Sequence, residues 1–250
     1  MNTAKPEYMN LSQKLRKMKL SGMADELDRQ AEDPNIDLRN ADERITELIE
    51  AEWSLRYNKK LNRFLKKATL RYPTATIDET IYDADRKLDY QSIEQLATCE
   101  WIDHRRNLLI TGRSSTGKSY MGNAFGVCAI KQFRNVKYVK ASVLMAEYEQ
   151  AEVKGEMLEY INMMSSLALL IIDDFGLMNL DLNKCRNMFE VLDSREGRGS
   201  TMVISQLPVS SWYDLFSNNT YGDACMERLI RGAYRLEFNG RNMRDPEDKA

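Results

Sequence analysis

The sequence has very little histidine and cysteine, the residue types on which most metal centres and disulfide frameworks depend. Its 250 residues contain one histidine, His104, and four cysteines, Cys99, Cys128, Cys185 and Cys225. The cysteines are widely spaced and form no C-x-x-C pair, which argues against a zinc site or a disulfide framework. A single histidine in a polar turn, with no matching Cys/Asp cluster, argues against metal or Ser-His-Asp chemistry.

Long apolar stretches are also missing. The most hydrophobic run, SLALLII at residues 166–172, has the length of a strand and falls well short of the roughly 18 residues of a membrane span. The first residues, MNTAKPEYMNLSQKLRK, contain no apolar segment typical of a secretory signal, so we expect a cytoplasmic protein with no membrane partner. With a formal net charge of −2, the chain as a whole is not a polycation.

Positive charge is nevertheless concentrated in one segment, residues 56–72, RYNKKLNRFLKKATLRY. It contains seven basic residues and no acid, and Tyr57, Phe64 and Tyr72 stand among them. Basic residues interleaved with aromatic rings favour a surface that binds duplex DNA largely independently of base sequence. The alternative is a helix face that is simply exposed to solvent, which is the usual interpretation of a run of charges. The candidate DNA-binding residues are Arg56, Lys59, Lys60, Arg63, Lys66, Lys67 and Arg71, with Lys154 of a later helical segment as a second candidate.

The character of the chain changes near residue 75. Before it, apolar residues such as Leu11, Leu15 and Met18 recur at helical spacing, and Pro73 ends the basic helix. From residue 107 onward, short apolar strands alternate with helices, which predicts an α/β domain with a parallel, doubly wound sheet. The predicted division is a helical domain for DNA binding or assembly over residues 1–75, a connector over 76–106, the α/β domain over 107–240 and a polar tail over 241–250.

The stretch ITGRSSTGKSYMGNAFG, residues 110–126, matches the phosphate-binding pattern G-x-x-x-x-G-K-[ST]. An apolar strand runs into it and a helix begins near Lys118, so backbone N–H groups and the helix N-terminus would point at a phosphate. Lys118 would reach the β- and γ-phosphates of ATP, and the Ser119 hydroxyl would bind Mg²⁺. The predicted nucleotide-binding residues are Gly112, Arg113, Ser114, Ser115, Thr116, Gly117, Lys118, Ser119 and Tyr120.

A second element, LALLIIDDFG at residues 167–176, is a hydrophobic strand that ends in two acids. A carboxylate at the end of such a strand can hold the Mg²⁺ that Ser119 also binds, and Asp173 is predicted to do so. Asp174 is predicted to activate the attacking water, although its side chain is shorter than that of the usual glutamate. A solvent-exposed turn is the alternative, but the order of the two elements along the chain favours a nucleotide site.

Two further pairs of residues are candidates for catalysis. Ser205 and Gln206 follow the next apolar strand, where a polar residue would sense the γ-phosphate, but a simple turn explains them equally well. Arg228 and Arg231 lie one turn apart on a predicted helix. They are predicted to act as an arginine finger on a neighbouring subunit's nucleotide, and ion pairs with nearby glutamates are the alternative.

These segments together resemble the IstB-like helper ATPases of insertion-sequence transposition, which belong to the AAA+ superfamily and are related to the DnaC helicase loaders. The resemblance covers nearly the whole chain and rests on LRKMKLSGMADEL, LIEAEWSLRYNKKLNRFLKKATL, GRSSTGKSY, LLIIDDFG, ISQLPVSSWYDLF and ERLIRGAYRLEFNGRNMR. It implies an AAA+ P-loop domain, an ATP-dependent oligomer that assembles on DNA, and a partner transposase, encoded nearby, that receives target DNA.

The sequence departs from the family pattern in three places. Arg113 and Ser115 replace the usual proline and glycine inside the loop, and Ile204 stands where a threonine commonly precedes Ser-Gln. The segment after the last predicted strand is also too short for the helical lid of most AAA+ proteins. Because such a lid would provide a second sensor arginine, we expect residues at subunit contacts, such as Arg228, to take that role.

Two other functions remain open at the level of the sequence. A helicase loader would carry the same motifs, and an adjacent transposase gene would separate the two. A DNA-bound structural protein with a vestigial nucleotide site is the other alternative, because Ser115 and Asp174 depart from the usual residues. ATP turnover stimulated by DNA would exclude it, and we expect slow hydrolysis that DNA or a partner stimulates.

Overall fold

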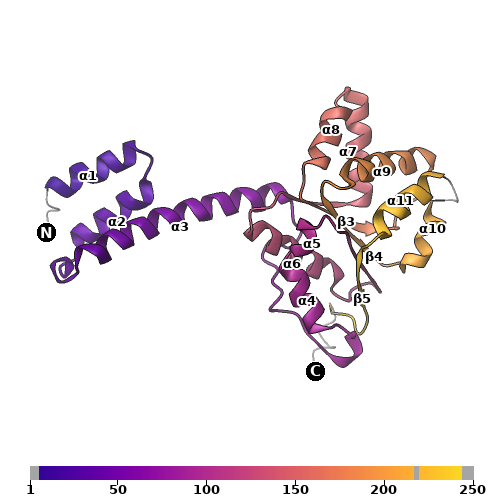
Figure 1. Ribbon diagram of the computed structural model, residues 1–250, viewed down its shortest axis with the longest axis horizontal. Helices are drawn as coiled ribbons and strands as arrows, with labels where there is room; N and C mark the ends of the chain where they lie inside the picture. The colour runs from indigo at the N-terminus through magenta and orange to yellow at the C-terminus, as the bar shows by residue number, and fades with distance from the viewer. Residues whose placement is uncertain (1–5, 217–219, 244–250) are drawn as a thin grey trace. The chain divides into compact units, whose positions relative to one another are not determined.

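The computed structural model describes residues 6–216 and 220–243, with side chains from residue 11 onward (Figure 1). The chain divides after Arg63 into two compact units, which we call the helical unit and the sheet unit. The division falls inside helix α3 (Ala41–Ala68), so the domain boundary near residue 75 stays a prediction. None of the helices in the described residues combines the length and the apolar character that crossing a bilayer requires.

The helical unit contains α1 (Pro6–Lys17), α2 (Ser21–Glu32), the short 3-10 turn η1 (Ile36–Leu38) and most of α3. Helix α2 packs closely on α3 at Gly22, where a Cβ atom would lie 2.7 Å from the carbonyl oxygen of Ala51. The Glu52 carboxylate accepts hydrogen bonds from the backbone N–H groups of Gly22 at 2.7 Å and Met23 at 3.3 Å, and so caps the start of α2. A glycine and a buried acid therefore define how α2 and α3 meet.

The sheet unit is built on one five-stranded sheet in the order β2-β3-β4-β1-β5, and every neighbouring pair is parallel. The strands are β1 (Leu108–Gly112), β2 (Val136–Lys140), β3 (Leu169–Phe175), β4 (Ser200–Ser205) and β5 (Tyr234–Phe238). After β1 the chain crosses to the far edge of the sheet and then returns through β3 and β4. In such a sheet, ligands bind at the carboxyl ends of the strands where the order reverses.

Helices cover both faces of the sheet, which confirms the doubly wound α/β fold predicted from the sequence (Figure 1). One face carries α6 (Lys118–Lys131), with α4 (Tyr90–Ala97) and α5 (Glu100–Asp103) beyond it. The other face carries α7 (Ala141–Lys154), α8 (Met157–Ser165), α9 (Leu182–Arg195), α10 (Trp212–Leu215) and α11 (Thr220–Ile230). Two short 3-10 turns, η2 (Ala84–Arg86) and η3 (Val209–Ser211), lie in the connections.

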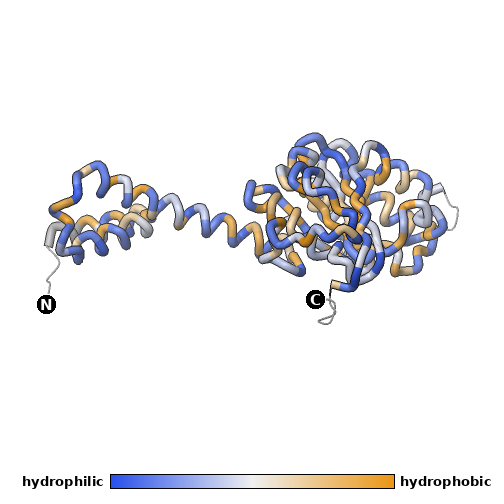
Figure 2. The backbone as a smooth tube through the Cα atoms, turned by 90° about the horizontal axis from the view of Figure 1, so that it is seen from below, coloured by the Kyte–Doolittle hydropathy of each residue, from blue (hydrophilic) through white to orange (hydrophobic). Residues whose placement is uncertain are grey.

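The core forms because strand side chains point alternately to the two faces. In β3, Leu170 and Ile172 pack into the cluster under α7–α11. Ile171 points to the opposite face, where it meets α6: a Cβ atom on Gly126 would lie 3.0 Å from its side chain. In the sheet unit, Figure 2 shows hydrophobic segments gathered toward the middle and hydrophilic ones mostly on the outside.

Candidate nucleotide-binding site

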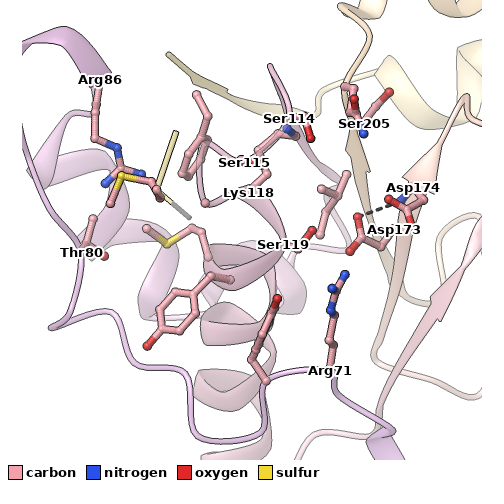
Figure 3. A pocket seen from close by; sticks show the side chains of 18 of the residues that line it. Arg71, Thr80, Arg86, Ser114, Ser115, Lys118, Ser119, Asp173, Asp174 and Ser205 are labelled. Atoms are coloured by element: carbon pink, nitrogen blue, oxygen red, sulfur yellow. Dashed lines mark hydrogen bonds between the residues drawn. The ribbon is translucent and has the colours of Figure 1, made fainter. Parts of the chain in front are cut away.

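A cavity of about 350 Å³ lies at the carboxyl ends of β1, β3 and β4 (Figure 3). It is lined by parts of the predicted phosphate-binding loop, by Asp173 and Asp174 at the end of β3, and by Ser205 and Gln206 at the end of β4. From the loop, the lining residues are Ser114, Ser115, Gly117, Lys118, Ser119 and Tyr120. The two separately predicted elements, the loop and the pair of acids, therefore meet in one cavity.

The backbone conformation of the loop explains why residue 112 is a glycine and why Ser115 is strained. Gly112 has a φ of +138°, and a Cβ atom there would lie 2.0 Å from the carbonyl oxygen of Phe238 in β5. Ser115 has a φ of +63°, a left-handed conformation that glycine adopts freely and that costs another residue about 1 kcal/mol. Ser115 thus takes the shape expected of a glycine, at an energetic cost.

Helix α6 begins at Lys118, directly after Gly117, so its first N–H groups face the cavity. Lys118 is only 6% exposed, and its ammonium donates to the Arg113 carbonyl oxygen at 2.5 Å. The Thr116 hydroxyl donates to the same oxygen at 2.8 Å. Gly112, Arg113 and Thr116, all predicted to bind nucleotide, do not line the cavity; they shape the loop that does.

The Asp173 carboxylate is held in place from two sides. Its Oδ2 accepts a hydrogen bond from the Tyr138 hydroxyl of β2 at 2.7 Å, and its Oδ1 accepts one from the Asp174 N–H at 2.7 Å. Burial, with the hydrogen bond to Asp173, raises the pKa of Tyr138, so the phenol stays protonated and donates. Tyr138 is therefore a positioning residue that the sequence did not reveal.

Asp174 has a φ of +55° and lies at an irregularity in the pairing of β3 with β4. Its Oδ2 is 2.7 Å from the ammonium of Lys140, the last residue of β2, and its side chain is 31% exposed. The left-handed turn aims consecutive carboxylates in different directions, so Asp173 and Asp174 are able to serve different roles in the same cavity.

The residues fit Mg²⁺ as it binds with nucleotides. Each oxygen of the Asp173 carboxylate accepts one hydrogen bond and keeps a further lone pair, and Ser119 lines the same cavity. Within the described residues no group of three or more His, Cys, Asp or Glu side chains is placed to hold a metal. Mg²⁺ takes one or two protein ligands and completes its shell with water and substrate phosphates, which is the set of ligands that Asp173 and Ser119 would begin.

At the end of β4, the Ser205 hydroxyl donates to the Phe175 carbonyl oxygen at 2.6 Å and accepts from the Leu207 N–H at 3.1 Å. Ser205 is 1% exposed, so this hydroxyl is committed to joining the ends of β3 and β4. Gln206 also lines the cavity and is exposed, which makes its amide the more available of the two for sensing a γ-phosphate. The sensor role stays a prediction.

The two predicted finger residues lie away from the cavity. Arg228 stacks 4.6 Å from the Phe189 ring, and its Nε donates to Asp193 at 3.0 Å and lies 3.3 Å from Glu196. Its acidic partners thus lie in α9 and directly after it, and they are not the glutamates nearest in sequence. Arg231 is exposed and makes no ion pair with any other described residue. A role in a neighbouring subunit's site stays a prediction.

Most of the predicted DNA-binding residues share one face of α3. Arg56, Lys59, Lys60, Arg63, Lys66 and Lys67, which we call the basic stripe, are all exposed and recur at helical spacing. Arg56 also has a structural role, since its guanidinium donates to Glu52 at 2.6 Å and to the Lys19 carbonyl at 3.2 Å. Lys154 is exposed at the end of α7, beside Val153, which is 88% exposed.

Arg71, which was also predicted to bind DNA, does not lie with the other predicted DNA-binding residues. It lines the cavity with the phosphate-binding loop instead of continuing the basic stripe, because α3 ends at Ala68. Thr69 follows with a φ of +52°, which turns the chain away from the helix axis.

Sequence reasoning also missed the part of the wall that comes from the connector. Arg86 is 4% exposed, donates to the Thr116 carbonyl at 2.9 Å and lies over the Phe238 ring at 5.6 Å. The Tyr120 hydroxyl accepts from the Thr76 N–H at 3.2 Å and donates to Glu79. No local pattern marked Thr76, Glu79 or Arg86, because their partners are distant in sequence.

The beginning of the predicted polar tail also touches the site. The Met243 N–H donates to the Ser115 carbonyl at 2.8 Å, and the Arg241 guanidinium lies 3.1 Å from Asp83. These residues brace the loop and are part of the sheet unit; residues 244–250 of that tail lie outside the described residues.

The chain is similar in sequence to known ATP-binding proteins of insertion sequences. The profile of the IstB-like ATP binding protein family matches residues 13–250. The insertion sequence ATP-binding protein y4uH of Sinorhizobium fredii is 35% identical over 230 residues, which are 92% of each chain. The ATP-binding protein of insertion sequence IS1162 from Pseudomonas fluorescens is 34% identical over 197 residues, 79% of this chain and 85% of that one.

Solved structures agree in fold. The DnaC helicase loader superposes with a TM-score of 0.58 at 14% identity, over 68% of this chain and 99% of that one. DnaA of Aquifex aeolicus bound to AMPPCP superposes with a TM-score of 0.57 at 20% identity, over 70% and 53% of the two chains. The fold is therefore that of AAA+ P-loop proteins, and by sequence this chain belongs to the IstB-like ATP binding protein family.

Proposed function

We propose that the chain is an ATPase that binds and hydrolyses ATP with Mg²⁺, oligomerises on DNA and delivers target DNA to a transposase. One observation carries the ATPase part: Lys118, Ser119, Asp173 and Asp174 meet in one cavity at the carboxyl ends of adjacent parallel strands. A phosphate-binding loop alone would support binding only. The two acids beside it supply what metal binding and water activation require.

The residues divide the chemistry between them. The first N–H groups of α6 and the Lys118 ammonium bind the phosphates, and the ammonium exchanges its bond to the Arg113 carbonyl for phosphate oxygens. Ser119 and Asp173 would hold Mg²⁺, which would supply positive charge against the negative charge of the transition state. Asp174 orients and deprotonates water through the oxygen that Lys140 does not bind.

The proposal that the chain binds DNA and serves a transposase rests on the positive charge of α3 and on the relatives. The basic stripe presents cations along one face of α3, as a surface for phosphates requires. The relatives named above belong to insertion sequences, so the partner that fits is a transposase encoded beside this chain. Arg228 and Arg231 lie outside the chain's own cavity, and the finger role would complete a neighbour's site in an oligomer.

A helicase loader is the other candidate. The likeness to the DnaC loader, at 14% identity, concerns the fold and does not favour that function. Binding assays with the adjacent transposase and with a replicative helicase separate the two functions.

The test of the ATPase is Asp174→Asn. ATP binding should persist, because Asp173 and Lys118 remain, whereas turnover should fall about a hundredfold or more with the loss of the general base. Equilibrium nucleotide binding and phosphate release, each with and without duplex DNA, measure the two effects. Lys118→Ala should lose tight ATP binding itself, and Asp223→Asn, an exposed acid outside the cavity, is the matched control. Unchanged turnover in Asp174→Asn would move the catalytic role elsewhere.

The test of the DNA surface replaces Lys59, Lys60, Arg63, Lys66 and Lys67 with Gln. Each true phosphate contact removed should lower the log–log salt slope of duplex binding by about 0.9 while ATP affinity is retained. Base preference should hardly change, because phosphate contacts do not read sequence. An unaltered slope would mean a solvated face, and weaker binding with the same slope would mean a role in assembly.

A further inference from the structure

We infer that Arg71 binds the terminal phosphate of ATP and makes the site prefer ATP over ADP. The inference rests on the proposed function, since it assigns a further residue to the same cavity. It replaces the role in DNA binding that the charge pattern alone suggested for this arginine.

Arg71 is fixed in position by its neighbours in the chain. The Thr69 hydroxyl donates to the Tyr138 carbonyl oxygen of β2 at 2.8 Å, and the Tyr72 N–H donates to the Asn123 side chain of α6 at 3.1 Å. Between them, the Leu70 side chain packs against α6, where a Cβ on Gly126 would lie 3.2 Å from it. These contacts on β2 and α6 hold the backbone of Arg71 at the cavity wall.

The side chain is aimed at the catalytic end of the cavity. Figure 3 shows the Arg71 guanidinium directed toward Ser119 and Asp173, with Arg86 and Thr80 at the opposite end. It lies 5.3 Å from the Tyr72 ring, which supports it from its own segment. Arg71 is exposed and makes no ion pair with any other described residue, so its charge is available to a ligand.

The position matches the terminal phosphate of ATP and no other part of the nucleotide. Ser119 and Asp173 would hold the Mg²⁺ that accompanies the terminal phosphates, so a cation directed at these two residues is placed for the γ-phosphate. Around this point the chain has two carboxylates, and the cations beside them are the Lys118 ammonium and the Lys140 ammonium, which already pairs with Asp174 at 2.7 Å. A guanidinium there would donate two parallel hydrogen bonds to phosphate oxygens. ADP has no phosphate at this point, so the contact separates the two nucleotides.

The experiment measures the affinities of a non-hydrolysable ATP analogue and of ADP, both with Mg²⁺, for four proteins: the parent, Arg71→Gln, Arg71→Lys and Arg198→Gln. In Arg71→Gln the analogue should bind about tenfold or more weakly while ADP affinity hardly changes, because one charge-assisted contact to the γ-phosphate is lost. Arg71→Lys should recover part of the loss, since an ammonium keeps the charge but not the paired donors of a guanidinium. Arg198→Gln, which removes an exposed arginine outside the cavity, should match the parent.

Three results would overturn the inference. Equal losses for the analogue and ADP in Arg71→Gln would mean that Arg71 supports the loop without touching the γ-phosphate. No loss for either nucleotide would leave it without a role in the site. Unchanged nucleotide binding together with a salt slope for DNA lowered by about 0.9 would return Arg71 to the DNA surface. A parent protein that binds neither nucleotide would refute the proposed function itself, and is thereby distinguishable from these results.

Discussion

The two units of this chain are stabilised in different ways. In the sheet unit the central strand residues are apolar and fully buried, including Leu109, Leu170 and Ile171 at 0% exposure. In the helical unit only two apolar side chains of the described residues are buried, Ala24 and Leu27. Its buried positions also include polar and charged side chains, namely Ser12, Glu26, Gln30 and Glu52.

The helical unit also leaves large apolar side chains in water. Ile45, Ile49 and Trp53 recur every four residues along α3 and are 53%, 53% and 67% exposed. Apolar burial contributes about 25 cal/mol per Å² and tolerates small shifts, whereas a buried hydrogen bond to a charge depends on one geometry. The sheet unit is therefore stabilised mainly by the burial of apolar surface, and the helical unit by a few hydrogen bonds to buried charged or polar groups.

The largest expected effect is on the core of the sheet unit. Leu170→Ala should cost about 2–5 kcal/mol, because it opens a cavity in the middle of β3. Hydrogen exchange should become faster in β1, β3 and β4 while the amides of α2 keep their protection. Leu158→Ala, at a side chain 71% exposed, is the control and should change little. Faster exchange in both units would show that the two do not unfold separately.

The matching test in the helical unit is Glu52→Ala. It removes the acceptor of the Gly22 and Met23 N–H groups and the partner of Arg56, at an expected cost of about 1–3 kcal/mol. Exchange should become faster in α2, with ATP affinity unchanged. Glu50→Ala, an exposed acid on the same helix, is the control. If Glu52→Ala left α2 as protected as in the parent, the directional contacts would not be what stabilises this unit.

The same residue predicts a pH dependence. Burial alone would raise the pKa of Glu52, but the hydrogen bonds from Arg56, Gly22 and Met23 outweigh it and lower the pKa below the ordinary value of 4.5. The stability that the ionised carboxylate contributes is therefore complete above that ordinary value and is lost as pH falls through the lowered one. Acid should loosen α2 in the parent, and this loosening should be weaker in Glu52→Ala.

The smallest expected effect is at the phosphate-binding loop. Ser115→Gly should stabilise the sheet unit by less than about 1 kcal/mol, because relief of the left-handed strain is partly offset by the greater freedom of glycine in the unfolded chain. Thermal unfolding without nucleotide measures it. Ser114→Gly, at a position without a positive φ, should bring no gain. A loss of stability in Ser115→Gly would mean that the serine side chain makes a contribution larger than the strain.

The sequence by itself determined the parallel sheet, the phosphate-binding loop and the pair of acids at Asp173 and Asp174. Each depends on information that is local in the chain: short apolar runs between helical segments, fixed spacing in the loop, and a strand that ends in carboxylates. Because parallel strands bring their carboxyl ends to one edge, order along the chain was enough to expect that these elements meet.

Only the tertiary structure decided what surrounds them. Tyr138 bonds Asp173 across 35 residues and Arg86 bonds the loop across 30, while Ser205 uses its hydroxyl on the Phe175 carbonyl. Arg71 shows the physical reason most clearly. Its charge placed it with the basic stripe, but a left-handed turn at Thr69 and two hydrogen bonds to β2 and α6 carry it to the cavity. Charge and spacing describe what a side chain is able to bind, and the path of the backbone decides which ligand it reaches.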